Sequence, residues 1–378
     1  MKKSLALFLI LIMITLVGCT SSEMSSLYVE DEKAVGQYSS KDGVIPEKVF
    51  KSNDTYYALL QSYAGDEAYK IAVGPDFENL KTVYKSNEKE NVWFMDADGD
   101  IAAWTELSET DKQEVKVYDR NSGEIKTLYT DDGECICQNV KVYNGSVYFV
   151  KKNTAKKEAY IVRYDTQKKA IQPILKTKTK ITESGDCSIN CFNVNYGCLV
   201  YAYSELGMSI IKCIDIDETD DFEYKSRKAM LSKSDATYVY AVAYDKETEC
   251  IGVYCEGTDG SGTMGYIDSD DSGLWVFDYF SEELYAYRDQ IECCDGVLLY
   301  VEQVNASGDI MDHYSLEGYE FETEQSITGI PSVYSITIKD SILLTQWVDG
   351  TKKCKVYKGT IKNANEEDKE TEYEAQNI

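Results

Sequence analysis

Residues 139–150 read NVKVYNGSVYFV, and this segment decides the fold. Val140 and Val142 alternate with polar residues up to Asn144-Gly145, and a second alternating run follows. Successive side chains of a strand point to opposite faces, and Asn-Gly is a preferred pair for a type I′ turn between antiparallel strands. The segment therefore predicts a β-hairpin.

Two further strands are expected to complete a four-stranded sheet after this hairpin. Residues 160–164 are predicted as the third strand and residues 170–175 as the fourth, with a polar turn between them. Pro173 has no N–H to donate, so it suits an outermost strand. One sheet of this size cannot bury both of its faces, which means that copies of it must stack.

The same pattern recurs along the chain from residue 44. Hairpin turns are expected near residues 54, 99, 145, 197, 247, 296 and 341, so the repeat is 45–52 residues long. An apolar residue followed by Asp is expected to end the third strand at residues 118, 164, 214 and 277. This period is typical of β-propeller blades. We therefore expect an all-β fold, a β-propeller of seven blades with four antiparallel strands each; six or eight blades are the alternatives.

The last repeat lacks a fourth strand after Ile361. We expect an N-terminal strand, residues 47–51, to join the last blade and close the ring, because closure removes exposed sheet edges. The expected organisation is a lipoprotein signal peptide (1–18), a flexible polar tether (19–43), the β-propeller (44–361) and an acidic disordered tail (362–378).

The N-terminus has the pattern of an export signal. Lys2 and Lys3 precede an apolar run that is too short to span a membrane. Leu16-Val17-Gly18-Cys19 resembles the lipobox of bacterial lipoproteins. This resemblance implies cleavage before Cys19 and attachment of diacylglycerol, with palmitate as an acyl group, to its thiol. The expected location is the cell membrane, with the protein lipid-anchored on the extracytoplasmic face; an ordinary secretory leader is the alternative.

The repeats also resemble a known group of propellers. Their Tyr-rich strands and Asn-Gly turn are similar to the propeller repeats of bacterial surface lipoproteins, to TolB-like propellers and to the family called domain of unknown function 5050. The resemblance covers most of residues 44–361, although Tyr164-Asp165-Thr166 stands where such repeats often have Asp-Gly. It implies a module that binds ligands or partners more often than it catalyses a reaction.

The charge restricts the choice of partner. The chain has a formal net charge of −27, a field that repels phosphate, so nucleic-acid binding is not expected. No GxSxG, Walker loop or GxGxxG follows a predicted strand and opens a helix, which argues against common enzyme classes. We expect a monomeric binding or scaffold module for a small molecule, a glycan or a protein. A glycan-acting hydrolase with a carboxylate pair, and an accessory subunit of an export or envelope-assembly complex, are the alternatives.

Ligands are expected at the mouth of the central channel, where loops lead into the innermost strands. The candidate residues at this rim are Asn91, Asn139, Asn190, Tyr238 and Asp289. A second candidate is residues 256–273, predicted as one long loop that carries Asp259, Asp268 and Asp270. Long loops in compact domains are often binding elements, although they also tolerate insertions.

Two further sets of residues have a functional and a structural interpretation. Asp96, Asp98 and Asp100 alternate as in a calcium-binding loop, and Ca²⁺ is the one cofactor considered. An ordinary hairpin turn is the favoured interpretation, because Asp and Gly dominate such turns. Trp93, Trp104, Trp275 and Trp347 could stack on sugar rings, but packing between sheets is the favoured interpretation.

Overall fold

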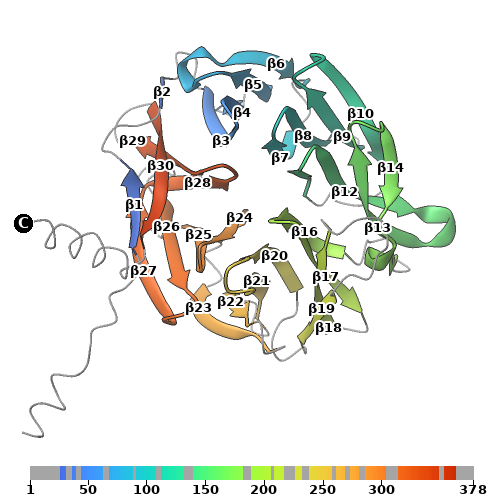
Figure 1. The fold of residues 1–378 in the computed structure, drawn as a ribbon, viewed down its shortest axis with the longest axis vertical. Helices are drawn as coiled ribbons and strands as arrows, with labels where there is room; N and C mark the ends of the chain where they lie inside the picture. The colour runs from blue at the N-terminus through green and yellow to red at the C-terminus, as the bar shows by residue number, and fades with distance from the viewer. Residues whose placement is uncertain are drawn as a thin grey trace, which may run out of the picture.

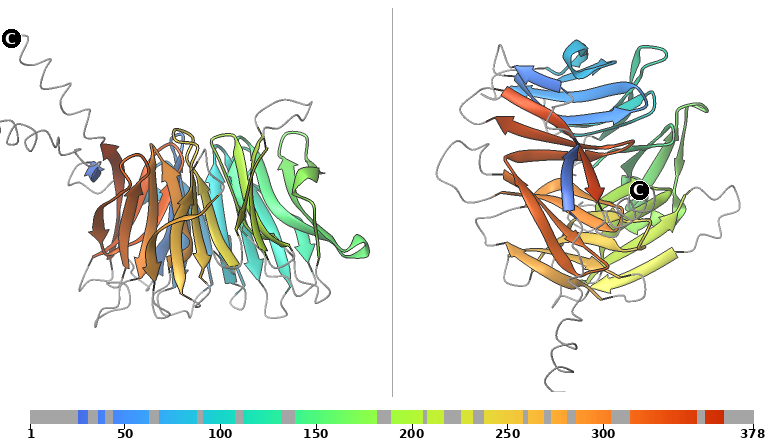
Figure 2. Two further views of the ribbon diagram at one scale, coloured as in Figure 1. Left: turned by 90° about the horizontal axis from the view of Figure 1, so that it is seen from below. Right: turned by 60° about the vertical axis from the view of Figure 1, so that its left-hand side comes forward.

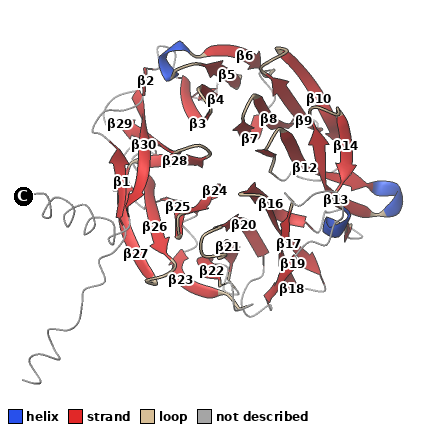
Figure 3. Cartoon of the chain, in the orientation of Figure 1, coloured by secondary structure: helices blue, strands red, loops and turns tan. Residues whose placement is uncertain are grey.

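The computed structural model is a ring of seven antiparallel β-sheets, called blades 1 to 7 here, placed around a common axis (Figure 1). It confirms the expected all-β propeller with seven blades. The structure describes residues 26–30, 36–39, 44–62, 68–87, 91–107, 112–131, 139–181, 189–205, 208–216, 226–231, 238–257, 261–268, 273–280, 286–303, 314–348 and 353–362. Helix within these residues is limited to short 3₁₀ turns, coloured blue in Figure 3: η1 (Phe77–Asn79), η2 (Thr154–Lys156) and η3 (Leu175–Thr177).

The strands of blades 1 to 6 follow the chain from the axis outward. Blade 1 contains β3 (Val44–Ser52), β4 (Thr55–Ser62), β5 (Lys70–Gly74) and β6 (Lys81–Lys85). Blade 2 contains β7 (Asn91–Asp98), β8 (Ile101–Leu107), β9 (Gln113–Asp119) and β10 (Glu124–Asp131). Blade 3 contains β11 (Lys141–Tyr143), β12 (Ser146–Asn153), β13 (Glu158–Asp165) and β14 (Ala170–Pro173), and β15 (Thr179–Lys180) also pairs with β13.

Blades 4 to 6 repeat this arrangement. Blade 4 contains β16 (Ile189–Asn195), β17 (Cys198–Glu205), β18 (Met208–Asp215) and β19 (Ser226–Leu231). Blade 5 contains β20 (Tyr238–Tyr244), β21 (Ile251–Glu256), β22 (Gly262–Ile267) and β23 (Trp275–Phe280). Blade 6 contains β24 (Ala286–Cys294), β25 (Val297–Gln303), β26 (Tyr314–Glu320) and β27 (Gln325–Pro331).

Blade 7 joins the two ends of the described chain. Its strands β28 (Val333–Ile338), β29 (Ile342–Val348) and β30 (Lys353–Lys362) come from the C-terminal part, and β1 (Ser26–Glu30) and β2 (Gly36–Ser39) both pair with β30. An N-terminal strand therefore closes the ring, as expected, but it is not residues 47–51. Those residues lie inside β3, where Val49 and Phe50 are buried and pair with β4.

The expected tether, residues 19–43, thus contains two strands of the propeller. Both are short, and the sequence around them is polar and lacks a sustained period. Their pairing with β30 is a contact between opposite ends of the chain, which local sequence patterns do not report.

The strands of blade 5 differ from a second expectation. Residues 256–273 are not one long loop, because β22 lies within them as the third strand of the blade. Consequently Phe277-Asp278, expected to end the third strand, belongs to the fourth strand, β23. Gly265 explains why a strand with two glycines fits here: a Cβ at this position would lie 2.5 Å from the carbonyl oxygen of Trp275. Only glycine permits this close approach of the two backbones.

The hydrophobic core lies between the blades. Each of seven clusters of buried side chains joins two neighbouring blades, from blades 1 and 2 round to blades 7 and 1. At the junction of blades 1 and 2, for example, Tyr57 packs in one cluster with Trp104, and both side chains are 0% exposed. Burial of one such side chain is worth roughly 1.5–3 kcal/mol. Each sheet therefore depends on its neighbours for burial of its faces.

The ring has two different ends, seen from the side in Figure 2. The turns that join the first two strands of each blade lie at one end, which we call the hairpin face. The chain enters each innermost strand at the opposite end, which we call the loop face. At the hairpin face Asn144-Gly145 has positive φ at both positions, as a type I′ turn requires.

Hydrogen bonds connect the hairpin turns of adjacent blades. The Asn144 N–H in blade 3 donates to Asp98 Oδ2 in blade 2 at 2.8 Å, and the Gly99 N–H in blade 2 donates to Ser52 Oγ in blade 1 at 2.8 Å. The Gly296 N–H in blade 6 likewise donates to Asp245 in blade 5 at 3.2 Å. These bonds fix each blade relative to the one before it.

Two ion pairs cross the ring near the hairpin face. Lys339 Nζ of blade 7 lies 2.9 Å from Asp96 Oδ2 of blade 2 and donates to the Val142 carbonyl of blade 3 at 2.9 Å. Lys141 of blade 3 lies 3.5 Å from Glu292 of blade 6, on the opposite side of the ring. Only 11% of the Lys339 side chain and 2% of the Asp96 side chain are exposed, so solvent screens this pair weakly.

We predict that Lys339→Met destabilises the protein by about 3 kcal/mol, because removal of one partner leaves a buried charge at Asp96. Urea unfolding measures the change. Lys246→Met, which removes an exposed lysine from the hairpin turn of blade 5, is the control and is expected to change stability by less than about 0.5 kcal/mol. Equal stability of the two variants would show that the pair does not hold blades 7 and 2 together.

We also predict that deletion of residues 26–39 lowers the melting temperature and causes aggregation, because β30 then loses both strands that pair with its outer edge. Thermal unfolding and light scattering measure these effects. A deletion of equal length at residues 365–378, outside the described residues, is expected to leave both unchanged. A monomeric, equally stable protein without residues 26–39 would contradict closure by these strands.

Candidate binding site

Irregularities in the innermost strands place extra residues near the loop face. In five blades the register between the first two strands skips one residue, which forms a β-bulge: Glu47, Trp93, Asn190, Tyr240 and Tyr334. A bulge redirects the side chain of the extra residue and is common at the rims of closed sheets and beside active sites. The ring therefore has one such residue at the same level in most of its blades.

Exposed aromatic rings occur at this level. Trp93 is 42% exposed in blade 2, and Tyr238, the first residue of β20, is 37% exposed in blade 5. Tyr240 lies between Tyr238 and Tyr254, with ring centroids 5.0 Å and 5.4 Å away, and its hydroxyl donates to Glu256 Oε2 at 2.6 Å. These contacts hold an aromatic surface in place at the loop face, suited to stacking against a sugar ring, an apolar side chain or a cation.

The polar rim residues have different surroundings. Asn91 is exposed at the start of β7. Asn139 Nδ2 donates to the Phe192 carbonyl at 3.3 Å and so connects blade 3 to blade 4. Asn190 is only 8% exposed and exchanges hydrogen bonds with Ser204 at 3.0 and 3.2 Å. Of these three amides, Asn91 is the one that faces solvent.

The remaining candidates of the rim and loop are placed as follows. Asp289 lies within β24, the innermost strand of blade 6, and its side chain is not described. Asp268 directly follows β22 and is half-buried. Asp259 and Asp270, like Cys19, lie outside the described residues.

The three carboxylates considered for Ca²⁺ do not converge. Asp96 accepts hydrogen bonds from the Val142 N–H and from Lys339. Asp98 accepts them from Ser52 and the Asn144 N–H. Asp100 accepts them from Arg120 and Asn121. Across the part of the chain that the structure describes, no group of three or more His, Cys, Asp or Glu side chains could hold a metal ion. The turn interpretation accounts for these residues, with the added role of joining blades.

Electrostatics keep the hydroxyl groups near blade 1 protonated. Burial raises the pKa of Tyr69 to about 12, and the nearby Glu47 carboxylate adds to the shift. Burial also raises the pKa of Tyr334, whose hydroxyl donates to the Pro46 carbonyl at 2.5 Å. Both shifts stabilise the neutral phenol relative to the phenolate.

Three of the four tryptophans have described side chains, and these differ in exposure; the side chain of Trp347 is not described. Trp104 is fully buried between blades, as the packing interpretation predicts, but Trp93 and Trp275 are exposed, and for these two that interpretation is wrong. Trp93 is the bulged residue of β7, and a bulge depends on strand register that the sequence does not reveal. Sequence reasoning also missed Tyr240, since its position in the cluster comes from the same kind of bulge.

Comparison with known proteins concerns the fold. No family model and no curated protein matches the sequence. The β-propeller domain of the Trilobed protease from Pyrococcus furiosus is similar at a TM-score of 0.55, with 11% identity, over 91% of this chain and 96% of that one. TolB from Acinetobacter baumannii has a TM-score of 0.41 with 10% identity, over 75% of this chain and 78% of its own. The class of protein is therefore a seven-bladed β-propeller, a fold that serves many unrelated functions.

Within the described residues no helix is long and apolar enough to cross a membrane.

Proposed function

We propose that the protein is a binding or scaffold module whose ligand meets the ring at the loop face. The observation that carries this proposal is the presence of exposed aromatic rings at the starts of two innermost strands, Trp93 in blade 2 and Tyr238 in blade 5. The contacts at the hairpin face support the choice of the loop face as the binding end, because turn-to-turn hydrogen bonds and two ion pairs already engage the polar groups of the hairpin face.

We further propose that lipid on Cys19 anchors the propeller to the extracytoplasmic side of the cell membrane. Ser26 pairs with Lys362 at the hairpin-face end of β30. Seven residue steps separate Cys19 from Ser26, a distance of ~25 Å at full extension. With such a short connection the hairpin face of blade 7 would lie near the bilayer, and the loop face would be directed away from it.

The binding proposal predicts saturable binding without turnover when the purified protein is screened against glycans, metal ions and cationic peptides. For the ligand found, the double variant Trp93→Ala/Tyr238→Ala is expected to weaken binding at least about tenfold, since loss of an aromatic contact typically costs about 1–2 kcal/mol. Trp275→Ala, which removes an exposed ring from the outermost strand of blade 5, is the matched control and is expected to have no effect. Turnover of a glycan would instead favour the hydrolase alternative.

The anchor proposal predicts that the protein incorporates radiolabelled palmitate when it is expressed in bacteria, and that Cys19→Ala abolishes the label and releases the protein from the membrane fraction. The other cysteines serve as an internal control, because they remain in the variant. Label retained by Cys19→Ala, or an unlabelled parent protein, would exclude this anchor.

A further inference from the structure

Blade 3 has the opposite charge to the rest of the protein. Residues 139–181 contain eleven lysine and arginine residues and only two acidic residues, a net charge of +9 within a chain of −27. The two carboxylates already have local partners. Glu158 pairs with Lys178 at 2.5 Å, and Asp165 accepts hydrogen bonds from the Gln167 and Lys168 N–H groups. Blade 3 is therefore a positive region on a strongly negative molecule.

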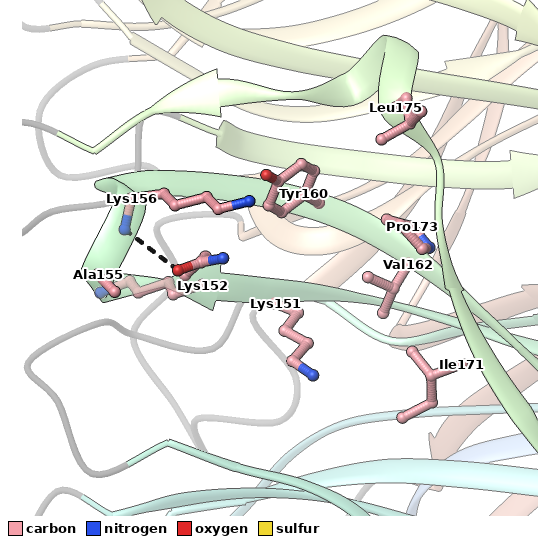
Figure 4. A pocket seen from close by; sticks show the side chains of 10 residues that line it. Lys151, Lys152, Ala155, Lys156, Tyr160, Val162, Ile171, Pro173 and Leu175 are labelled. Carbon is pink, nitrogen blue, oxygen red and sulfur yellow. Dashed lines mark hydrogen bonds between the residues drawn. The ribbon is translucent and has the colours of Figure 1, made fainter.

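A groove of about 540 Å³ lies on this blade, over β12, β13 and β14 (Figure 4). Val162, Ile171, Pro173 and Leu175 give it an apolar wall, in which Leu175 is 70% exposed. Lys151, Lys152 and Lys156 line its other end, beside the Tyr160 ring. An exposed apolar surface next to lysine side chains is suited to a ligand that has both apolar groups and negative charge.

The surrounding contacts determine how such a ligand can be recognised. The outer edge of β13 is already paired, since the Ile174 N–H donates to the Ile161 carbonyl and the Ile161 N–H donates to Thr177 Oγ1, both at 2.9 Å. A peptide cannot add to β13 as a further strand, and Pro173 in the outermost strand β14 has no N–H to donate, so side chains are expected to supply most of the recognition. Lys151 Nζ lies 5.7 Å from the centre of the Tyr129 ring of blade 2, which helps to hold this side chain at the groove.

We propose that this groove binds an acidic peptide segment of a partner protein, with an apolar side chain of the peptide on the Leu175 side and carboxylates at the lysines. A simple anion would use only the lysines. The three lysines adjoin the turn between β12 and β13, which is at the loop face. If the lipid anchor holds the hairpin face near the bilayer, this end of the groove is directed away from the membrane, which favours a protein partner over lipid headgroups.

Fluorescence anisotropy with two labelled synthetic peptides tests the proposal. The first peptide has twelve residues, eight Glu and four Leu, and the second has Ser in place of Leu. The parent protein is expected to bind the Leu peptide more tightly, and binding is expected to weaken as salt is added. Lys151→Gln/Lys156→Gln is expected to weaken binding about tenfold, whereas Leu175→Ser is expected to remove the preference for the Leu peptide.

Matched controls separate this site from the loop-face site. Lys81→Gln/Lys85→Gln removes two exposed lysines from β6 of blade 1 and is expected to change the affinity less than about twofold. Trp93→Ala/Tyr238→Ala is also expected to bind the peptide normally, so failure of either proposal leaves the other testable. Circular dichroism confirms that each variant is folded.

Four results would overturn the proposal. The first is that the Leu peptide does not bind, and the second is that the blade 1 control loses as much affinity as Lys151→Gln/Lys156→Gln. The third is that the protein binds phosphatidylglycerol vesicles but not the peptide, and the fourth is that the protein self-associates and the Leu peptide disrupts this self-association. The last two would assign the groove to lipid headgroups or to a second copy of this chain.

Discussion

The pairing of β30 with β1 and β2 is the contact on which the ring depends. Without it, the outer edge of β30 would expose unpaired backbone groups, and blade 7 would consist only of strands from the C-terminal part of the chain. The closed ring also brings blade 7 against blade 1, where Tyr334 donates to the Pro46 carbonyl and Thr337 to the Val49 carbonyl. Every hydrophobic cluster spans two blades, and the cluster between blades 7 and 1 forms only when the ring is closed.

The two ends of the ring are built from different kinds of interaction. At the hairpin face, short turns are joined by backbone-to-carboxylate hydrogen bonds, and charged side chains meet inside the ring. At the loop face, bulges redirect individual side chains, and aromatic rings remain accessible. Rigidity at one end would therefore support the proposed recognition surface at the other, an arrangement that suits binding without large rearrangement.

Local chemistry explains what could be predicted from the sequence. Asn144-Gly145 indicates a hairpin by itself, and Tyr118-Asp119 and Tyr164-Asp165 mark the ends of third strands, because turn geometry depends on neighbouring residues. The repeat length then leads to seven blades. The rim positions Asn91 and Tyr238 follow from the same repeat, since they begin innermost strands.

Contacts between distant residues explain what could not be predicted. Lys339 and Asp96 lie far apart in the sequence, and the residues around each of them do not indicate the other as a partner. β1 and β2 are short and polar, β22 contains two glycines, and the exposure of Trp93 results from a register shift. The Lys339–Asp96 pair and the pairing of β1 and β2 depend on distant parts of the chain, whereas β22 and the exposure of Trp93 depend on strand register within one blade.

The ion pairs across the ring have a consequence for how its blades are coupled. Lys141 with Glu292, and Lys339 with Asp96 and Val142, connect blades on different sides of the axis close to one end. Each pair joins blades that are not neighbours, so the two pairs brace the ring across its axis. A change of charge at one of these four side chains would therefore act on a blade at a distance round the ring.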